Sequence, residues 1–600
     1  MVDLNDGIAE TRLPQGSMVT TDVVVVGSGP AGAGAALFLS TLGIPNIMIT
    51  KYRWTANTPR AHITNQRTME IFRDLGIEDQ ALADATPHEL MGDTVFCTSI
   101  AGEEIGRILT WGTHPARLAD YRLASPCLPA DLPQTYLEPI LVRNAAQRGT
   151  QVQFSTEYMG HRQDSDGVDV DVRDRLTGEQ YTIRAKYLIG ADGARSKVAA
   201  DLDLPTEGAM DIAGSMNITF KADLAAYVAH RPSVLYWVLR PGSDIGGIGA
   251  GLVRMVRPWN EWLVVWGYDI NQPPPVVDEA AAVQIVRNLL GLPDIDVEIT
   301  GTSLWGNNEM YATHLQSGRV FCAGDAVHRH PPSNGLGSNT SIQDSYNLAW
   351  KLAAVLRGQA APSLLDTYSV ERAPVARQIV QRANKSSREF VQFFEVLGLL
   401  DAKDEAEMVA RIEERKANTP EGAAKRAALV SAMELKNYEF NAHGVELGQF
   451  YESDAVTSDG TRRPEPSRDS ELYYEPSTVP GSRLPHAWVG DARHKFSTLD
   501  LAPMTQFTLL TGIAGEPWVA AADKVSHELG VPLEAVLIGP GHRVTDLYYD
   551  WARLREIDED GALLVRPDKH IGWRSIRLPA DPHRALHEAM SAILGRPVAA

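Results

Sequence analysis

Hydrophobic and polar positions follow two different patterns along this chain of 600 residues. Residues 22–26 form a short run that is apolar on both faces, which predicts a buried strand of a parallel sheet. An Ala-rich segment from residue 30 to about 42 predicts a helix, and residues 46–50 predict a second strand. Together they make a βαβ unit, so the chain opens as an α/β fold.

The pattern changes from about residue 216 to 269. Stretches such as 216–220 and 262–268 alternate apolar and polar residues between Pro-Gly and Gly-Gly turns, which predicts antiparallel strands. A buried strand near residues 319–323 and a helix from about 341 to 356 then return to the first pattern. We therefore predict an antiparallel sheet inserted into the α/β domain.

The predicted domain boundaries follow these changes of pattern. The predicted segments are a disordered lead-in at 1–20, an α/β domain at 21–390 with the inserted sheet at about 95–130 and 205–305, a helical connection at 391–475, and a C-terminal α/β domain at 476–600.

Composition excludes several classes of function. The chain has 56 Lys and Arg against 76 Asp and Glu, a net charge of −20 that would repel nucleic acid and anionic lipid. Cys97, Cys127 and Cys322 form no CxxC pair, so we expect neither a disulfide framework nor a cysteine metal site. Without a signal peptide or a long apolar stretch, we expect a cytoplasmic protein that binds neither nucleic acid nor membrane.

A glycine motif stands between the first strand and the first helix. It reads Gly27-Ser28-Gly29-Pro30-Ala31-Gly32, the GxGxxG spacing that lets a pyrophosphate rest on the amides of a helix N-terminus. An acidic residue usually ends the second strand and holds a ribose, but Lys51 stands there. The motif predicts a dinucleotide, and neighbours such as Arg53 would have to compensate at the ribose.

Two further motifs point to the cofactor. Asp192-Gly193 lies within residues 187–196, and Gly324-Asp325 opens a segment that runs through Pro331 and Pro332 to Gly335-Leu336-Gly337-Ser338-Asn339. In this order the three motifs resemble those of the FAD-dependent aromatic hydroxylases, the family of para-hydroxybenzoate hydroxylase and phenol hydroxylase. The resemblance extends to Arg60, which matches an arginine at the FAD pyrophosphate, and to Gln134, which matches a glutamine near the adenosine.

The resemblance is strongest to the phenol hydroxylase-like subgroup, through residues 58–70 and 231–237. It implies a Rossmann-like FAD-binding domain, the inserted substrate sheet and a thioredoxin-like C-terminal domain, here without cysteine after residue 440. The implied reaction reduces FAD with NAD(P)H and passes one oxygen atom of O2 through a flavin C4a-hydroperoxide to a phenolic, possibly chlorinated, ring. Asp325 would bind the ribityl chain, and the amides of residues 335–339 would stabilise the reduced flavin.

His62 is the predicted catalytic base, because it takes the place of an aspartate of phenol hydroxylase and its usual pKa of about 6.5 suits proton transfer near neutrality. The alternative is a histidine satisfied by local backbone groups. Tyr236, Trp237 and Trp266 are predicted to line the substrate site, and the Pro331 carbonyl is predicted to contact the substrate. His328 and His330 lie two apart near Asp325, but the flavin motif explains these residues better than a metal does.

Other functions stay open at this point. A tailoring hydroxylase of a hydroxypyridine or polyketide-derived ring fits the same motifs, since sequence does not show pocket volume. A flavin-dependent halogenase or a non-hydroxylating FAD protein is a second alternative. NADH and NADPH are not distinguished, and a homodimer is the default assembly.

Overall fold

A computed structural model describes residues 19–239 and 250–596. Its first layer is a sheet with the strand order β16-β17-β10-β1-β2-β7, in which β17, β10, β1, β2 and β7 run parallel. The bounds are β1 Val19–Val26, β2 Asn46–Ile49, β7 Gln151–Gln153, β10 Gln180–Gly190, β16 Gln316–Ser317 and β17 Val320–Cys322. The predicted first strand thus begins three residues earlier than expected, at Val19, and the α/β expectation is confirmed.

Helices bury this sheet. α1 (Pro30–Thr41) is almost wholly buried and packs against α6 (Gln134–Gln147) and α10 (Gly337–Leu356). A hairpin of β8 (Thr156–Gln163) and β9 (Val168–Asp174) extends the sheet through β10. The shorter elements are β3 Ile63–Thr64, α2 Gln66–Asp74, α3 Glu78–Asp84, α4 His88–Met91, α5 Pro115–Ala124, β6 Ala130–Asp131 and α7 Lys197–Asp201.

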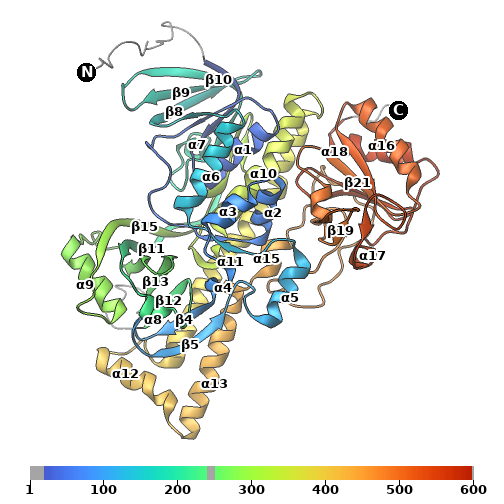
Figure 1. The fold of residues 1–600 in the computed structure, drawn as a ribbon. Coiled ribbons are helices and arrows are strands. Elements are labelled where there is room, and N and C mark those ends of the chain that lie inside the picture. Colours follow the sequence, from blue (N-terminus) through green and yellow to red (C-terminus); the bar gives the residue numbers. More distant parts are fainter. Residues whose placement is uncertain (1–18, 240–249, 597–600) are drawn as a thin grey trace, which may run out of the picture.

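The inserted sheet is the second layer, below the first in Figure 1, and has the order β18-β15-β11-β14-β13-β12-β4-β5. Its strands are β4 Asp93–Cys97, β5 Glu104–Leu109, β11 Thr206–Lys221, β12 Leu235–Leu239, β13 Ala250–Arg257, β14 Glu261–Tyr268, β15 Glu298–Ala312 and β18 His328–Arg329. Neighbouring strands run antiparallel except β4 and β12, as the alternating pattern predicts. α8 (Ala225–Val228) and α9 (Glu279–Leu290) share an apolar cluster with this sheet.

One long helix joins the two layers. α11 runs from Thr367 to Leu397, through the predicted domain boundary at residue 390, and its Phe390 and Phe393 pack on Phe96 of the inserted sheet. The helical connection then consists of α12 Glu405–Glu413, α13 Pro420–Leu435, α14 Asn437–Phe440 and α15 His443–Leu447.

The C-terminal domain lies beside the first layer (Figure 1). Its main sheet has the order β22-β21-β24-β25, with β21 parallel to β22 and antiparallel to β24, the strand directions expected of a thioredoxin-like domain. Its elements are β19 Trp488–Gly490, β20 Lys495–Ser497, β21 Phe507–Thr511, α16 Glu516–Leu529, β22 Leu533–Leu537, β23 Thr545–Asp546, α17 Asp550–Leu554, β24 Ala562–Val565, β25 Ile571–Ser575 and α18 Pro582–Ile593.

Buried ion pairs fix this domain to the first layer. Arg566 reaches both carboxylate oxygens of Glu371 on α11 and also pairs with Asp568. Arg483 pairs with Glu70 on α2. All five of these charged residues are fully or almost fully buried, so losing one of them would leave an uncompensated charge inside the protein.

Candidate active site

The first glycine motif has the close backbone contacts that a pyrophosphate site requires. Gly27 has a φ of +111°, and a Cβ on it would lie 2.1 Å from the carbonyl oxygen of Ala191. A Cβ on Gly32 would lie 2.0 Å from the carbonyl oxygen of Gly27. Gly29 stands at the N-cap of α1 and offers no side chain to the first amides of the helix. These amides, at the positive end of the helix, are therefore available to an anion.

The three motifs meet at the carboxyl ends of the parallel strands. Ala31 of α1, Ala191 after β10 and Ala323 after β17 form one small apolar cluster. Gly324 adopts a φ of +66°, and a Cβ there would lie 2.9 Å from the Cβ of Ala31. Segments far apart in sequence are thus brought into contact, as the resemblance predicted.

The two motif aspartates differ in their surroundings. Asp192 accepts hydrogen bonds from Ser196 Oγ and from the amide of Lys197, so its carboxylate caps α7. Asp325 is exposed, and its carboxylate makes no hydrogen bond within residues 19–239 and 250–596. Asp325 is therefore free to bind a polyol chain, whereas Asp192 shapes the turn that carries Gly193.

The N-terminus of α10 offers a second set of free amides. Asn334 and Gly335 both take positive φ values, 69° and 61°, which turn the chain into the helix. Leu336 stands at the N-cap and makes no side-chain cap, so the amides of Gly337, Ser338 and Asn339 are available to a ligand. The side chain of Asn339 holds the neighbouring segment, since it accepts from the amide of Asn65 and donates to the carbonyl of Ile63.

His330 was not predicted as a flavin contact, although it lies against this helix start. Its ring atoms are 3.7 Å from the position of a Cβ on Gly337, and its buried Nε2 has no partner in the described part of the chain. Its Nδ1 pairs with the carbonyl oxygen of Pro331 at 2.6 Å, the carbonyl predicted to touch the substrate. Pro331 is buried and Pro332 is exposed.

The remaining predicted cofactor residues lie beside the segment of His62 and at the carboxyl end of β2. Gln134 begins α6 and accepts a hydrogen bond from the amide of Ala61, next to Arg60. Arg60 is exposed, and its Nε donates to Thr58 while its two Nη atoms make no hydrogen bond to a described residue. Lys51 is exposed at the end of β2, where its ammonium lies 5.5 Å from the ring centre of Tyr52.

His62 is paired with a carboxylate that sequence reasoning missed. Its Nδ1 lies 2.7 Å from Oδ1 of Asp131, which is fully buried and also accepts from Thr86 Oγ1 at 3.0 Å. Burial lowers the pKa of His62 to about 4, Arg254 lowers this pKa as well, and Asp131 opposes both. The imidazole is therefore neutral at pH 7, and its Nε2 faces away from Asp131 as a proton acceptor.

Arg254 on β13 is the second residue that sequence reasoning missed. It is 2% exposed, and its Nη1 donates to the carbonyls of Pro59 and Arg60. Its Nε and Nη2 have no partner among residues 19–239 and 250–596. Burial lowers the pKa of Arg254 to about 10, so the guanidinium stays charged at pH 7. A buried cation with free donors beside the loop of His62 indicates a site for an oxygen anion.

Strand register decides which predicted aromatic residues face this site. Trp237 pairs with Leu252, two residues from Arg254, so both side chains lie on one face of the sheet. The buried Nε1 of Trp237 also has no partner in the described chain. Tyr236 is the neighbour of Trp237 in β12, and Trp266 is the neighbour of Val265, the β14 residue paired with Leu252. Both therefore lie on the opposite face of the sheet, where Tyr236 contacts Trp262. Trp237 therefore shares the sheet face of Arg254, and Tyr236 and Trp266 do not.

His328 belongs to a buried hydrogen-bond network. Its Nε2 pairs with Asp344 at 2.9 Å, and Asp344 also accepts from Arg372 and from the amide of Gly324. Burial alone would raise the pKa of Asp344, but Arg372 and His328 hold it below its usual range. No group of three or more His, Cys, Asp or Glu side chains within the described ranges is placed to hold a metal.

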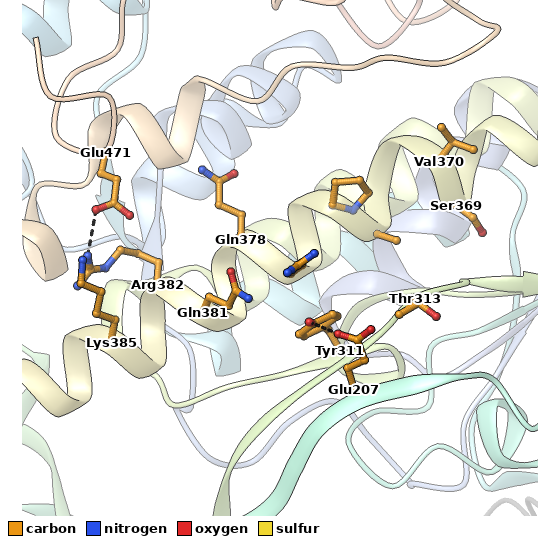
Figure 2. A pocket seen from close by; sticks show the side chains of 13 residues that line it. Glu207, Tyr311, Thr313, Ser369, Val370, Gln378, Gln381, Arg382, Lys385 and Glu471 are labelled. Atoms are coloured by element: carbon orange, nitrogen blue, oxygen red, sulfur yellow. Dashed lines mark hydrogen bonds and ion pairs between the residues drawn. The ribbon is translucent and has the colours of Figure 1, made fainter. Parts of the chain in front are cut away.

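A separate groove of about 570 Å³ runs along the outer face of α11 (Figure 2). Gln378 and Gln381 line one wall, and Tyr311 and Glu207 line the other. None of the predicted site residues lines this groove. It is therefore distinct from the site at His62.

Comparison with known proteins fits this geometry. Residues 20–383 match the FAD binding domain family, and residues 477–597 match the family described as aromatic-ring hydroxylase, C-terminal. The chain belongs to the FAD-dependent aromatic hydroxylases. Relatives of this hydroxylase include phenol 2-monooxygenase of Pseudomonas sp. (strain EST1001), 63% identical over 98% of this chain and 96% of the relative. Another is 2,4-dichlorophenol 6-monooxygenase of Cupriavidus pinatubonensis, 57% identical over 96% of this chain and 97% of the relative.

Solved structures agree with the fold of this hydroxylase. The flavin-dependent monooxygenase PieE in complex with FAD and substrate matches with a TM-score of 0.91 and 44% identity, over 96% of this chain and all of PieE. Aklavinone-11 hydroxylase matches with a TM-score of 0.78 and 29% identity, over 96% of this chain and 99% of that chain. No helix in the part of the hydroxylase that the structure describes is long and apolar enough to cross a membrane.

The residues of the cradle fit FAD. The close-packed glycines and the uncapped starts of α1 and α10 suit the pyrophosphate and the flavin ring, and Asp325 and the buried Nε2 of His330 remain free to pair with the cofactor. The expected cofactor is thereby confirmed, and NAD(P)H is the reductant typical of this family.

Proposed function

We propose that this hydroxylase acts on a phenol whose hydroxyl oxygen binds between His62 and Arg254. The observation that carries the proposal is the pairing of His62 with the buried Asp131, on the chain segment whose Pro59 and Arg60 carbonyls hold Arg254. Neutral imidazole accepts the phenol proton, and the guanidinium stabilises the phenolate that results. The names of the two curated relatives support a phenolic substrate, chlorinated in one case.

The charges of the site explain how proton transfer becomes favourable. In the free protein Arg254 lowers the basicity of His62, so the base is not protonated in advance. When the proton moves to His62 Nε2, four charges of alternating sign stand in a row. They are the Asp131 carboxylate, the His62 imidazolium, the phenolate and the Arg254 guanidinium. Each neighbouring pair then attracts, and in a buried site such attraction is much stronger than in water.

A phenolate ring is the electron-rich partner that flavin hydroxylation needs. When bound, FAD would supply the chemistry that transfers one oxygen atom of O2, with NAD(P)H as the reductant. The chain supplies position: free amides at the starts of α1 and α10 would hold the cofactor, and His62, Arg254 and Trp237 would hold the phenol. The unpartnered Nε1 of Trp237, on the sheet face of Arg254, supports a role as donor to the same oxygen or to a ring substituent.

His62→Gln tests the assignment, with His494→Gln, an exposed histidine of the C-terminal domain, as the matched control. In the wild type, kcat/KM reports the free enzyme, so its acid limb should lie near pH 4 rather than near 6.5. His62→Gln should lose most phenol hydroxylation at pH 7 and recover as pH rises toward the phenol pKa of about 10. Unchanged turnover with an unchanged pH profile would remove His62 from the mechanism.

The assembly and location are also proposals. A homodimer is the commonest assembly for such a chain, and light scattering after size exclusion tests it. The three free, buried cysteines and the use of NAD(P)H support a cytoplasmic location. NADPH and NADH are to be compared directly as reductants.

A further inference from the structure

Trp111 contacts the predicted base from a strained backbone position. It is 3% exposed and has a φ of 48°, a left-handed conformation that bulky side chains rarely adopt. Its ring centre lies 6.3 Å from that of His62, with the two rings nearly perpendicular at 79°. Strain of this kind persists only where the surrounding structure enforces it, and it concentrates at functional sites.

The surroundings enforce it through a segment that is remote in sequence. The amide of Trp111 donates to the carbonyl of Phe440 at 3.0 Å, and the carbonyl of Trp111 lies 3.3 Å from His88 Nε2. Asn441 fixes both sides of the turn, since its Nδ2 donates to the carbonyl of Leu109 at 2.9 Å and its Oδ1 accepts from the amide of Gly112. Residues 440 and 441 belong to the helical connection between the FAD-binding domain and the C-terminal domain.

A second aromatic ring, that of Phe440, also packs against the indole of Trp111. The ring of Phe440 meets it edge-on at 5.6 Å and 80°, so Trp111 stands between Phe440 and His62. Trp111, Phe440 and Ile63 belong to the apolar cluster that includes the inserted sheet. A ring bound through its hydroxyl at His62 therefore meets the indole as a fixed apolar wall.

We propose that Trp111 limits the size of the aromatic ring that this hydroxylase accepts, and that Asn441 is the positioning residue that holds Trp111 in place. This inference rests on the proposed phenol site at His62. Because the indole is pinned at its backbone and by Phe440, it cannot retreat to admit a bulkier ring. Rejection by a rigid apolar wall is worth about tenfold or more for even one extra methylene group.

Trp111→Gly tests the wall, because glycine removes the indole and also tolerates the positive φ. We compare kcat/KM for phenol and for 4-phenylphenol in the FAD-loaded enzyme. The ratio should shift toward 4-phenylphenol by about tenfold or more, and less product should form from phenol for each NAD(P)H oxidised. If Trp111→Gly does not fold, Trp111→Phe should shift the ratio in the same direction by a smaller factor. The matched control is Trp266→Phe, on the opposite face of the sheet, which should leave the ratio unchanged.

Asn441→Ala tests the positioning role. Alone it should shift the ratio in the same direction as Trp111→Gly by a smaller factor. Combined with Trp111→Gly it should add nothing, because Asn441 acts through the indole that is already absent. A merely structural Asn441 would lower kcat for both phenols equally and would do so in the Trp111→Gly background too.

The outcomes separate this inference from the proposed function. A wild-type enzyme that hydroxylates neither phenol nor its simple derivatives overturns the proposed function. An active enzyme in which folded Trp111 variants keep the wild-type ratio overturns the wall. Additive effects of Asn441→Ala and Trp111→Gly overturn the positioning role alone.

Discussion

Replacing Asp131 by Asn isolates the charge behind the predicted base. The side chain is fully buried, accepts from Thr86 through one oxygen and pairs with His62 through the other. Asparagine has the same shape and can keep both contacts, so the packing of β3 and β6 should be preserved. What changes is the negative charge, which raises the pKa of His62 against burial and Arg254.

The expected size of the effect follows from that pair. A hydrogen bond to a charged group contributes about 1.5–3 kcal/mol, and about 1.4 kcal/mol corresponds to a factor of ten in rate. Asp131→Asn should therefore lower kcat for phenol by roughly ten- to a hundredfold. 4-Nitrophenol is already mostly ionised at pH 8 and keeps ring hydrogens beside its hydroxyl group, so its kcat should change by no more than about threefold.

The assay measures hydroxylated product and NAD(P)H oxidation side by side, from pH 5 to 9, with bound FAD quantified by absorbance. A selective loss with phenol that is restored at high pH would support the account. An equal loss with both substrates, or no loss with either, would refute the idea that Asp131 acts through proton transfer to His62.

Three other perturbations have expected results. Gly32→Ala should abolish FAD binding, measured by flavin fluorescence, since its Cβ would lie 2.0 Å from a carbonyl oxygen, whereas Gly160→Ala, with nothing within 4 Å, should retain the flavin. Arg566→Met should lower the free energy of unfolding by about 3–5 kcal/mol in denaturant, because Glu371 and Asp568 would stay buried and charged. The control is Arg577→Met at an exposed ion pair, which should change this free energy by under about 1 kcal/mol. Burial raises the pKa of Glu446 to about 8, so the wild-type protein loses stability as pH rises from about 4.5 to 8, where the unfolded chain ionises this group and the folded protein does not. Glu446→Gln removes this loss, and its stabilising effect in thermal melts should therefore grow across the same pH range. A stabilisation that does not depend on pH would contradict this reasoning.

Local patterns predict a cofactor cradle because each motif carries its own geometry. The GxGxxG segment needs only a strand before it and a helix after it, and Gly27 and Gly32 indeed stand where a Cβ would collide with backbone. Helix α2 begins at Gln66 because Asn65 before it is a side-chain cap that accepts from the amide of Thr68. Such features depend on neighbours within a few residues, which sequence shows directly.

The catalytic partners depend on contacts between distant segments. Asp131 lies 69 residues after His62 and reaches it because β3 pairs with β6. Arg254 looks like an ordinary polar position in an alternating strand until the inserted sheet folds against Pro59 and Arg60. No pattern near either residue gives its partner.

The aromatic residues show what the alternation of apolar and polar residues in a strand cannot predict. Period two places Trp237 on one face and Tyr236 on the other, but it does not say which face meets the cofactor domain. The hydrogen bonds of Arg254 decide this, and they place Trp266 with Tyr236 on the far face. Trp111 gave no signal either, because its position is fixed by Phe440 and Asn441, more than 300 residues later.

The most direct test of the account is turnover of the purified, FAD-loaded protein with phenol, NADPH and isotopically labelled O2. The account predicts oxidation of NADPH that phenol stimulates and a dihydroxybenzene that carries one labelled oxygen, with both reduced in His62→Gln. A protein that binds no flavin, or that oxidises NADPH with phenol to give only labelled peroxide in wild type and variant alike, would contradict it.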